Sequence, residues 1–110
     1  MGAWNNKPYD NDGASDWFAG LMDRSKLRDH WHQSLSTCDI DDRPEIARAA
    51  VWMFIQLGHV YVWPIENYGD DLNLAIETAE VLRHNPELTE AEGMQKTLES
   101  EYQLLLSRKR

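Results

Sequence analysis

Carboxylates are the chemically most informative side chains of this 110-residue chain, and they gather in two segments that connect predicted helices. One segment follows Cys38 and the other follows Pro64. Clustered carboxylates can bind a divalent cation, take part in acid–base catalysis, or attract a basic surface of another protein. Two aromatic residues accompany the second segment, and such side chains are common anchors in protein interfaces. The candidate partner-binding residues are Asp39, Asp41, Asp42, Trp63, Glu66, Tyr68, Asp70 and Asp71.

The chain is strongly acidic, and its charge is unevenly distributed. Nineteen Asp and Glu residues against eleven Lys and Arg residues give a formal net charge of −8, and no Lys or Arg occurs between Ala49 and Leu82. A nucleic-acid backbone and an anionic membrane both require positive charge at the contact. We therefore expect no nucleic acid and no membrane among the partners, and a basic protein as the favoured partner.

The segment Asp10–Asp16 is rich in oxygen ligands but does not match a calcium-binding loop. Such a loop requires an oxygen ligand at position 5, Gly at position 6 and Glu at position 12. Counted from Asp10, those positions hold Ala14, Ser15 and Leu21. The segment is typical instead of a turn that leads into a helix cap.

The histidines and the single cysteine also lack the spacing of a catalytic or metal site. His30 and His32 are two residues apart, whereas a helical zinc pair requires a separation of four. Cys38 belongs to an apolar helical stripe, which is typical of a packed, unreactive thiol. One cysteine also excludes an internal disulfide and fits a reducing cytoplasm, where we expect the protein to be located. We predict no catalytic residue, no metal ligand and no cofactor.

Apolar residues recur at helical spacing through most of the chain and predict an all-α fold. The segment from Ile46 to about Val62 is apolar on most of its circumference, which indicates a helix buried on most sides. Pro64 is predicted to end it. We expect a single helical domain over residues 1–110, a compact bundle of four to five helices around this buried central helix, with an irregular N-terminal arm.

Capping signals predict where the helices begin. Whether residues 25–36 form a separate helix or continue the first one stays open at this point. Asn85 and Pro86 are predicted to stop the helix that precedes them. The expected N-caps are Asp12 for the first helix, Asp42 for the central helix, Asp70 or Asp71 for the next, and Thr89 for the last.

Five tryptophans are a heavy use of this residue in 110 positions. Trp17, Trp31 and Trp52 fall on apolar faces of predicted helices, so we expect them in the core. Trp4 and Trp63 fall in connections, where a packed role and a role as binding anchor both stay open.

The first seventeen residues carry a specific resemblance. The string Met1-Gly2-Ala3-Trp4, followed by Pro8-Tyr9-Asp10-Asn11-Asp12, Ala14 and Asp16-Trp17, resembles the opening of the domain-of-unknown-function 4259 family of small bacterial proteins. Asn5, Lys7 and Tyr9 stand where that family has Gly, Gly and Phe. The resemblance implies a helical domain, and it brings no established activity and no catalytic residues to this chain.

Together these features favour a small acidic binding protein that covers a basic partner. Immunity proteins act in this way when their carboxylates mimic phosphates at the active site of a toxin. One alternative is a structural or homo-oligomeric protein, in which the apolar excess of residues 46–63 forms a homodimer. A second alternative is a metal-dependent enzyme, which would need at least two carboxylates converging in one pocket.

Overall fold

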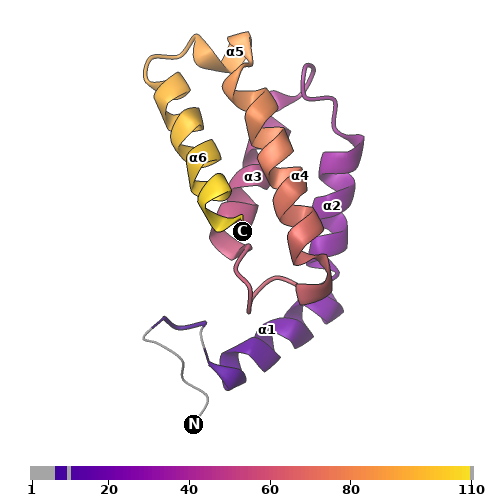
Figure 1. The fold of residues 1–110 in the computed structure, drawn as a ribbon. Helices are drawn as coiled ribbons and strands as arrows, with labels where there is room; N and C mark the ends of the chain where they lie inside the picture. The colour runs from indigo at the N-terminus through magenta and orange to yellow at the C-terminus, as the bar shows by residue number, and fades with distance from the viewer. Residues whose placement is uncertain (1–6, 10, 110) are drawn as a thin grey trace.

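The computed structural model describes residues 7–9 and 11–109, and their regular elements are six α-helices (Figure 1). The predicted all-α bundle is confirmed for these residues. Most of the predicted N-terminal arm, including Trp4 and Asp10, lies outside the described residues. In chain order the helices are α1 (Asp12–Ser25), α2 (Leu27–Thr37), α3 (Pro44–Leu57), α4 (Ile65–Arg83), α5 (Pro86–Thr89) and α6 (Met94–Arg108).

Four of the helices, α2, α3, α4 and α6, form the body of the bundle, with α5 at one end and α1 across the other (Figure 1). The most extensive contacts join α4 to α6 and α4 to α3, and α3 packs in turn against α2. Lys26 separates α1 from α2, because its left-handed backbone (φ 55°) ends the first helix and lets the chain change direction. Residues 25–36 therefore belong mainly to a separate helix.

The core follows the predicted apolar stripes of α4 and α6. Residues of α4 at helical spacing are all buried, and in α6 Leu98 and Leu105 are buried while Met94 and Tyr102 are half-buried. The stripe of α4 was predicted from periodicity alone and is confirmed in full. Its members are Leu72, Ala75, Ile76, Ala79 and Leu82.

Helix α3, which was predicted to be buried on most sides, has one face exposed to solvent. Val51 and Phe54 are fully buried, but the side chain of Trp52 is 59% exposed and that of Ile46 is 39% exposed. The expectation that Trp52 lies in the core is wrong, and Trp17 is likewise 59% exposed. Helix α3 carries apolar residues all round, but α2, α4 and α6 cover only part of its circumference.

The end of α3 also differs from the prediction. The helix ends at Leu57, where the N–H of Gly58 donates to the carbonyl oxygen of Phe54 (2.6 Å). Residues 58–63 then form tight turns, in which the N–H groups of Val62 and Trp63 both donate to the carbonyl oxygen of His59. These turns place the side chain of Trp63 in the core, and α4 follows directly after Pro64.

Gly58 is required at this bend because its backbone lies close to Phe54 in the last turn of α3. A Cβ atom at position 58 would collide with the carbonyl oxygen and ring of Phe54, whereas one at Gly69, on the exposed side of α4, would meet no atom within 4 Å. We expect Gly58→Ala to lower the free energy of unfolding by about 1–3 kcal/mol through this overpacking. Gly69→Ala should raise it by about 0.4–1 kcal/mol, because alanine restricts the unfolded chain and favours the helix. Urea denaturation of the two variants measures both effects, and equal stabilities would contradict the packing of the bend.

Several predicted caps are displaced from the observed helix ends. Asn11, and not Asp12, caps α1, since its side-chain oxygen accepts a hydrogen bond from the N–H of Ala14 (2.8 Å). Asp42 does not cap α3: Asp39 Oδ1 accepts hydrogen bonds from the N–H groups of Asp41 and Asp42, which closes the preceding turn. The residue at the N-cap position of α3 is Arg43, whose side chain makes no capping hydrogen bond.

Helices α4 and α6 begin at positions that the capping signals did not predict. Helix α4 starts at Ile65, so Asp70 and Asp71 lie inside it and cap nothing. Thr89 ends the short helix α5, and α6 begins after Gly93, whose φ of 79° lies in the left-handed region that favours glycine.

Arg83 joins α4 to α6 through hydrogen-bonded ion pairs. Its guanidinium group donates to Glu99 (2.6 Å) and to Glu80, and it lies 4.2 Å from the centre of the Tyr102 ring. The pKa of Glu99 is lowered, first by the hydrogen bond from Gln103 and then by that from Arg83. The pKa of Arg83 is raised chiefly by the bond to Glu99. These contacts of Arg83 with Glu99 and Tyr102 fix the position of α6 along α4.

Candidate partner-binding surface

Trp63, predicted as an aromatic anchor in an exposed connection, is a core residue. Its side chain is 2% exposed. Its ring packs edge-to-face on Trp31 (centroids 5.1 Å apart) and on Phe54 (5.0 Å). The assignment of Trp63 to a partner-binding surface is therefore wrong. The turns of residues 58–63 fold it inward, and no pattern in the local sequence indicates them.

Asp71, also predicted to face a partner, is buried and fully paired. Its side chain is 1% exposed and accepts hydrogen bonds from Nε and Nη2 of Arg28 (both 2.7 Å) and from Nε1 of Trp63 (2.8 Å). The hydrogen bonds that Arg28 donates to Asp71 are the largest influence on the pKa of its guanidinium group and raise it. Asp71 therefore ties α2, the α3–α4 turn and α4 together, and its assignment to a docking surface is wrong.

The start of α4 explains why Asp71 is inside. The helix begins at Ile65, so Asp71 is already part of it. Because Asp71 lies four residues before Ala75, the two side chains share the inward face of the helix. Glu66 and Asp70 are exposed on other faces, and Tyr68 is half-buried against Phe54 (centroids 6.1 Å apart). Of the second acidic segment, two carboxylates remain available to a partner.

The first acidic segment remains fully accessible at the opposite end of the bundle. Asp39, Asp41 and Asp42 are all exposed in the connection between α2 and α3, whereas Glu66 and Asp70 lie on the first turns of α4 near α1 (Figure 1). The two predicted segments do not form one patch.

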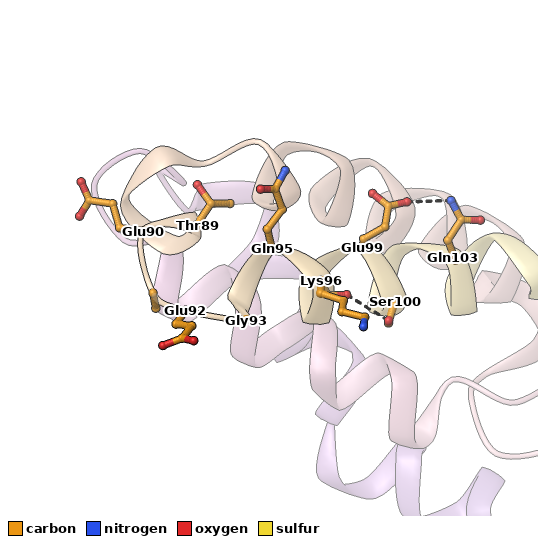
Figure 2. A pocket seen from close by; sticks show the side chains of 10 residues that line it. Thr89, Glu90, Glu92, Gly93, Gln95, Lys96, Glu99, Ser100 and Gln103 are labelled. Carbon is orange, nitrogen blue, oxygen red and sulfur yellow. Dashed lines mark hydrogen bonds between the residues drawn. The ribbon is translucent and has the colours of Figure 1, made fainter.

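Helix α5 and the connection to α6 bring further carboxylates to the end where α3 begins (Figure 1). Glu45 on α3 and Leu88 on α5 line one hollow of about 300 Å³, which shows that the two elements are neighbours. Glu90 and Glu92 project away from the ribbon beside the first turns of α6 (Figure 2). We call this surface the acidic end; its exposed carboxylates are Asp39, Asp41, Asp42, Glu45, Glu87, Glu90 and Glu92.

Basic residues compensate little of this charge. Arg43 is exposed among the carboxylates, with its Nε 4.0 Å from Asp42, and Lys96 is the third residue of α6 (Figure 2). Arg48 is engaged by Glu101 (2.9 Å). The acidic end therefore has a clear excess of negative charge at neutral pH.

An aromatic side chain adjoins the acidic end. Trp52 lines the same hollow as Glu45 and Leu88, and Ala49 and the Arg48–Glu101 pair complete its lining. The hollow combines an exposed indole ring with a charged rim, which is the composition of an interface anchor. Trp52 was not predicted as a surface residue because its position on an apolar helix indicated the core.

The described residues contain no group of three or more His, Cys, Asp or Glu side chains arranged to hold a metal ion. None of the described helices combines the length and the apolarity that a membrane crossing requires. Cys38 is half-buried at the end of α2, with its Sγ 3.6 Å from the carbonyl oxygen of Arg43.

Comparison of the chain with protein-family models, with curated proteins and with solved structures gave no match. A function for this chain is therefore inferred from the geometry of the described residues.

Proposed function

We propose that this chain is a binding protein whose acidic end docks on a basic protein, in the manner of an inhibitor that covers its partner's functional surface. The supporting observation is the gathering of seven exposed carboxylates, drawn from two separate chain segments, at one end of the bundle. Helix ends and ion pairs account for only some of them. Glu45 and Glu87 lie in the first turns of α3 and α5. Asp42 lies 4.0 Å from Arg43, whereas Glu90 and Glu92 point into solvent.

Electrostatics gives this surface its selectivity. Like-signed charges on one face steer an oppositely charged partner and raise the rate of association, and they disfavour acidic competitors. If the partner acts on nucleic acid, its own active site is basic, and the carboxylates occupy positions where phosphates bind. Such a partner fits an immunity-type inhibitor, the class that the sequence composition also favours.

The exposed indole of Trp52 supplies the apolar part of the interface. Rim charges mainly set the rate of association, whereas a desolvated aromatic ring in the centre of an interface often contributes most of the affinity. The partner we infer therefore presents basic residues around an apolar side chain that enters the hollow beside Trp52.

Neutralisation of three carboxylates tests the role of the acidic end. The partner is captured by cross-linking in the cells that make the protein, then purified and titrated by surface plasmon resonance. We expect the triple variant Asp41→Asn, Asp42→Asn, Glu90→Gln to bind it at least about tenfold more weakly, mainly through slower association. The loss should shrink as the salt concentration rises, because salt screens exposed charges.

A control variant carries the same change of charge on other surfaces: Asp16→Asn, Asp23→Asn and Glu77→Gln, all exposed in the structure. We expect it to bind within about threefold of the wild type. Capture of only acidic partners, or equal losses for the two triple variants, would contradict the proposal.

A homodimer is the second candidate, and the bare apolar face of α3 favours it. Trp52 and Ile46 expose apolar surface that a second copy of the chain could cover. Sedimentation velocity at tens of micromolar distinguishes the two candidates. A dimer that Trp52→Glu converts to monomer supports self-association, and a monomer at all concentrations rules it out.

A further inference from the structure

A second hollow, of about 950 Å³, lies at the end of the bundle opposite to the acidic end. It is bounded by the first turns of α4, the last turn of α6, the turn after α3 and the residues that precede α1. Its volume is within the range of small-molecule sites in proteins. No feature of the proposed partner interface involves it.

The charge of this hollow is opposite to that of the molecule. Lys7, Arg108 and Lys109 line it, and none of the described lining residues is acidic, although the whole chain has a net charge of −8. Asp70 is the carboxylate nearest to Tyr68 and Gly69 along α4, and it is exposed outside the hollow. A described lining that contains cationic but no acidic side chains favours an anionic ligand.

Arg108 is held in place by the end of α3. Its Nη2 donates to the carbonyl oxygen of Ile55 (2.8 Å), and its Nη1 donates to the carbonyl oxygens of Gly58 (3.2 Å) and Phe54 (3.4 Å). Those carbonyls form the negative end of the helix dipole and offset part of the charge. Lys109 is exposed at the end of α6 and adds a second positive charge beside Arg108.

Aromatic rings form much of the remaining wall. Tyr9 stacks on His59, with ring centroids 4.6 Å apart and planes inclined by 19°, and the ammonium group of Lys7 lies 5.9 Å from the centre of the Tyr9 ring. Tyr61 and Tyr68 also line the hollow. Flat rings beside cations suit a ligand that has both a planar ring and a negative group.

We propose that this hollow binds a small phosphate monoester that carries a planar ring, of which a nucleoside monophosphate is the representative. A phosphate monoester has a charge of about −1.5 to −2 at pH 7, which matches several cations better than a carboxylate does. The ring stacks on the aromatic wall, and the phosphate lies toward Lys109 and Lys7. A polyanion such as nucleic acid is disfavoured, because it extends beyond the hollow onto acidic surface.

Calorimetric titration of the full chain with adenosine monophosphate, adenosine and inorganic phosphate tests the proposal. We expect the monophosphate to bind with a dissociation constant below about 1 mM, at least tenfold more tightly than either of the other two. Affinity should fall as the salt concentration rises. No binding of the monophosphate at 10 mM, or binding no tighter than that of phosphate or adenosine, would overturn the proposal.

Charge reversal locates the site. We expect Lys109→Glu to weaken binding of the monophosphate about tenfold. Lys96→Glu makes the same change of net charge at the opposite end of the bundle, on an exposed side chain, and should change affinity less than twofold. Equal effects of the two substitutions would show that net charge alone controls binding and would refute the site.

Removal of a ring tests the other half of the ligand. Tyr61 is 45% exposed, so Tyr61→Ser leaves the buried core in place. We expect this variant to weaken binding of the monophosphate about three- to tenfold without lowering the thermal unfolding midpoint by more than about 3 °C. A variant that binds the monophosphate as the wild type does would exclude the aromatic wall from the site.

Discussion

Replacement of Trp63 by alanine is expected to lower the free energy of unfolding by about 3–5 kcal/mol, the usual cost of removing a large aromatic side chain from a core. The ring packs edge-to-face against both Trp31 and Phe54, and its Nε1 donates a hydrogen bond to the buried carboxylate of Asp71 (2.8 Å). The substitution therefore leaves a cavity and removes one partner of a buried charge at the same time. Denaturation in urea, followed by circular dichroism, measures the loss.

Trp52→Ala is the matched control, because it removes the same side chain from an exposed position. With 59% of its side chain in solvent, Trp52 should contribute less than about 1 kcal/mol to stability. The sequence alone predicts the reverse order, with Trp52 in the core and Trp63 in a connection. Equal destabilisation by the two substitutions would contradict the observed path of the chain through residues 58–63.

Loss of the Asp71 carboxylate is expected to have the second large effect. Asp71→Ala should lower the free energy of unfolding by about 3 kcal/mol, at the lower end of the range for breaking a buried ion pair, since the side chain of Arg28 is 19% exposed and keeps some contact with water. The variant leaves the guanidinium group of Arg28 and the indole N–H of Trp63 without their acceptor.

Asp70→Ala is the control for this prediction, since it removes the neighbouring, exposed carboxylate and should change stability by less than about 0.5 kcal/mol. The double variant Arg28→Leu, Asp71→Leu separates the two sources of the loss. If the cost comes from an uncompensated charge, the double variant should recover part of the stability that Asp71→Ala loses. Equal stability of Asp71→Ala and Asp70→Ala would show that Asp71 is not the buried member of the pair.

Periodicity predicted the parts of the fold in which burial follows a repeating pattern. The inward stripe of α4, with members such as Leu72, Ala75 and Leu82, is confirmed, and so are Leu98 and Leu105 of α6. These helices each have one apolar face, so the direction of burial can be derived from the spacing. Helix α3 is apolar all round, and its sequence could not indicate which side would remain exposed.

The candidate docking surface was predicted in part. Asp39, Asp41 and Asp42 are exposed as expected, because short acidic residues after a helix rarely find buried partners. Glu90 and Glu92 follow Thr89, the expected cap of the last helix, and their local sequence does not indicate that they share a surface with Asp39, Asp41 and Asp42. Their position near the start of α3 depends on the packing of α6 against α3 and α4, which joins segments far apart in the sequence.

What the sequence by itself determined was the all-α class, the inward faces of α4 and α6, and the excess of negative charge, since each depends on composition or on spacing within one segment. The tertiary structure alone decided that Trp63 and Asp71 are interior while Trp52 faces solvent. The reason is physical: tight turns at residues 58–63 and a long-range pair between Arg28 and Asp71 fix those positions. Whether a side chain is buried depends on which distant segments pack over it, and no local pattern contains that information.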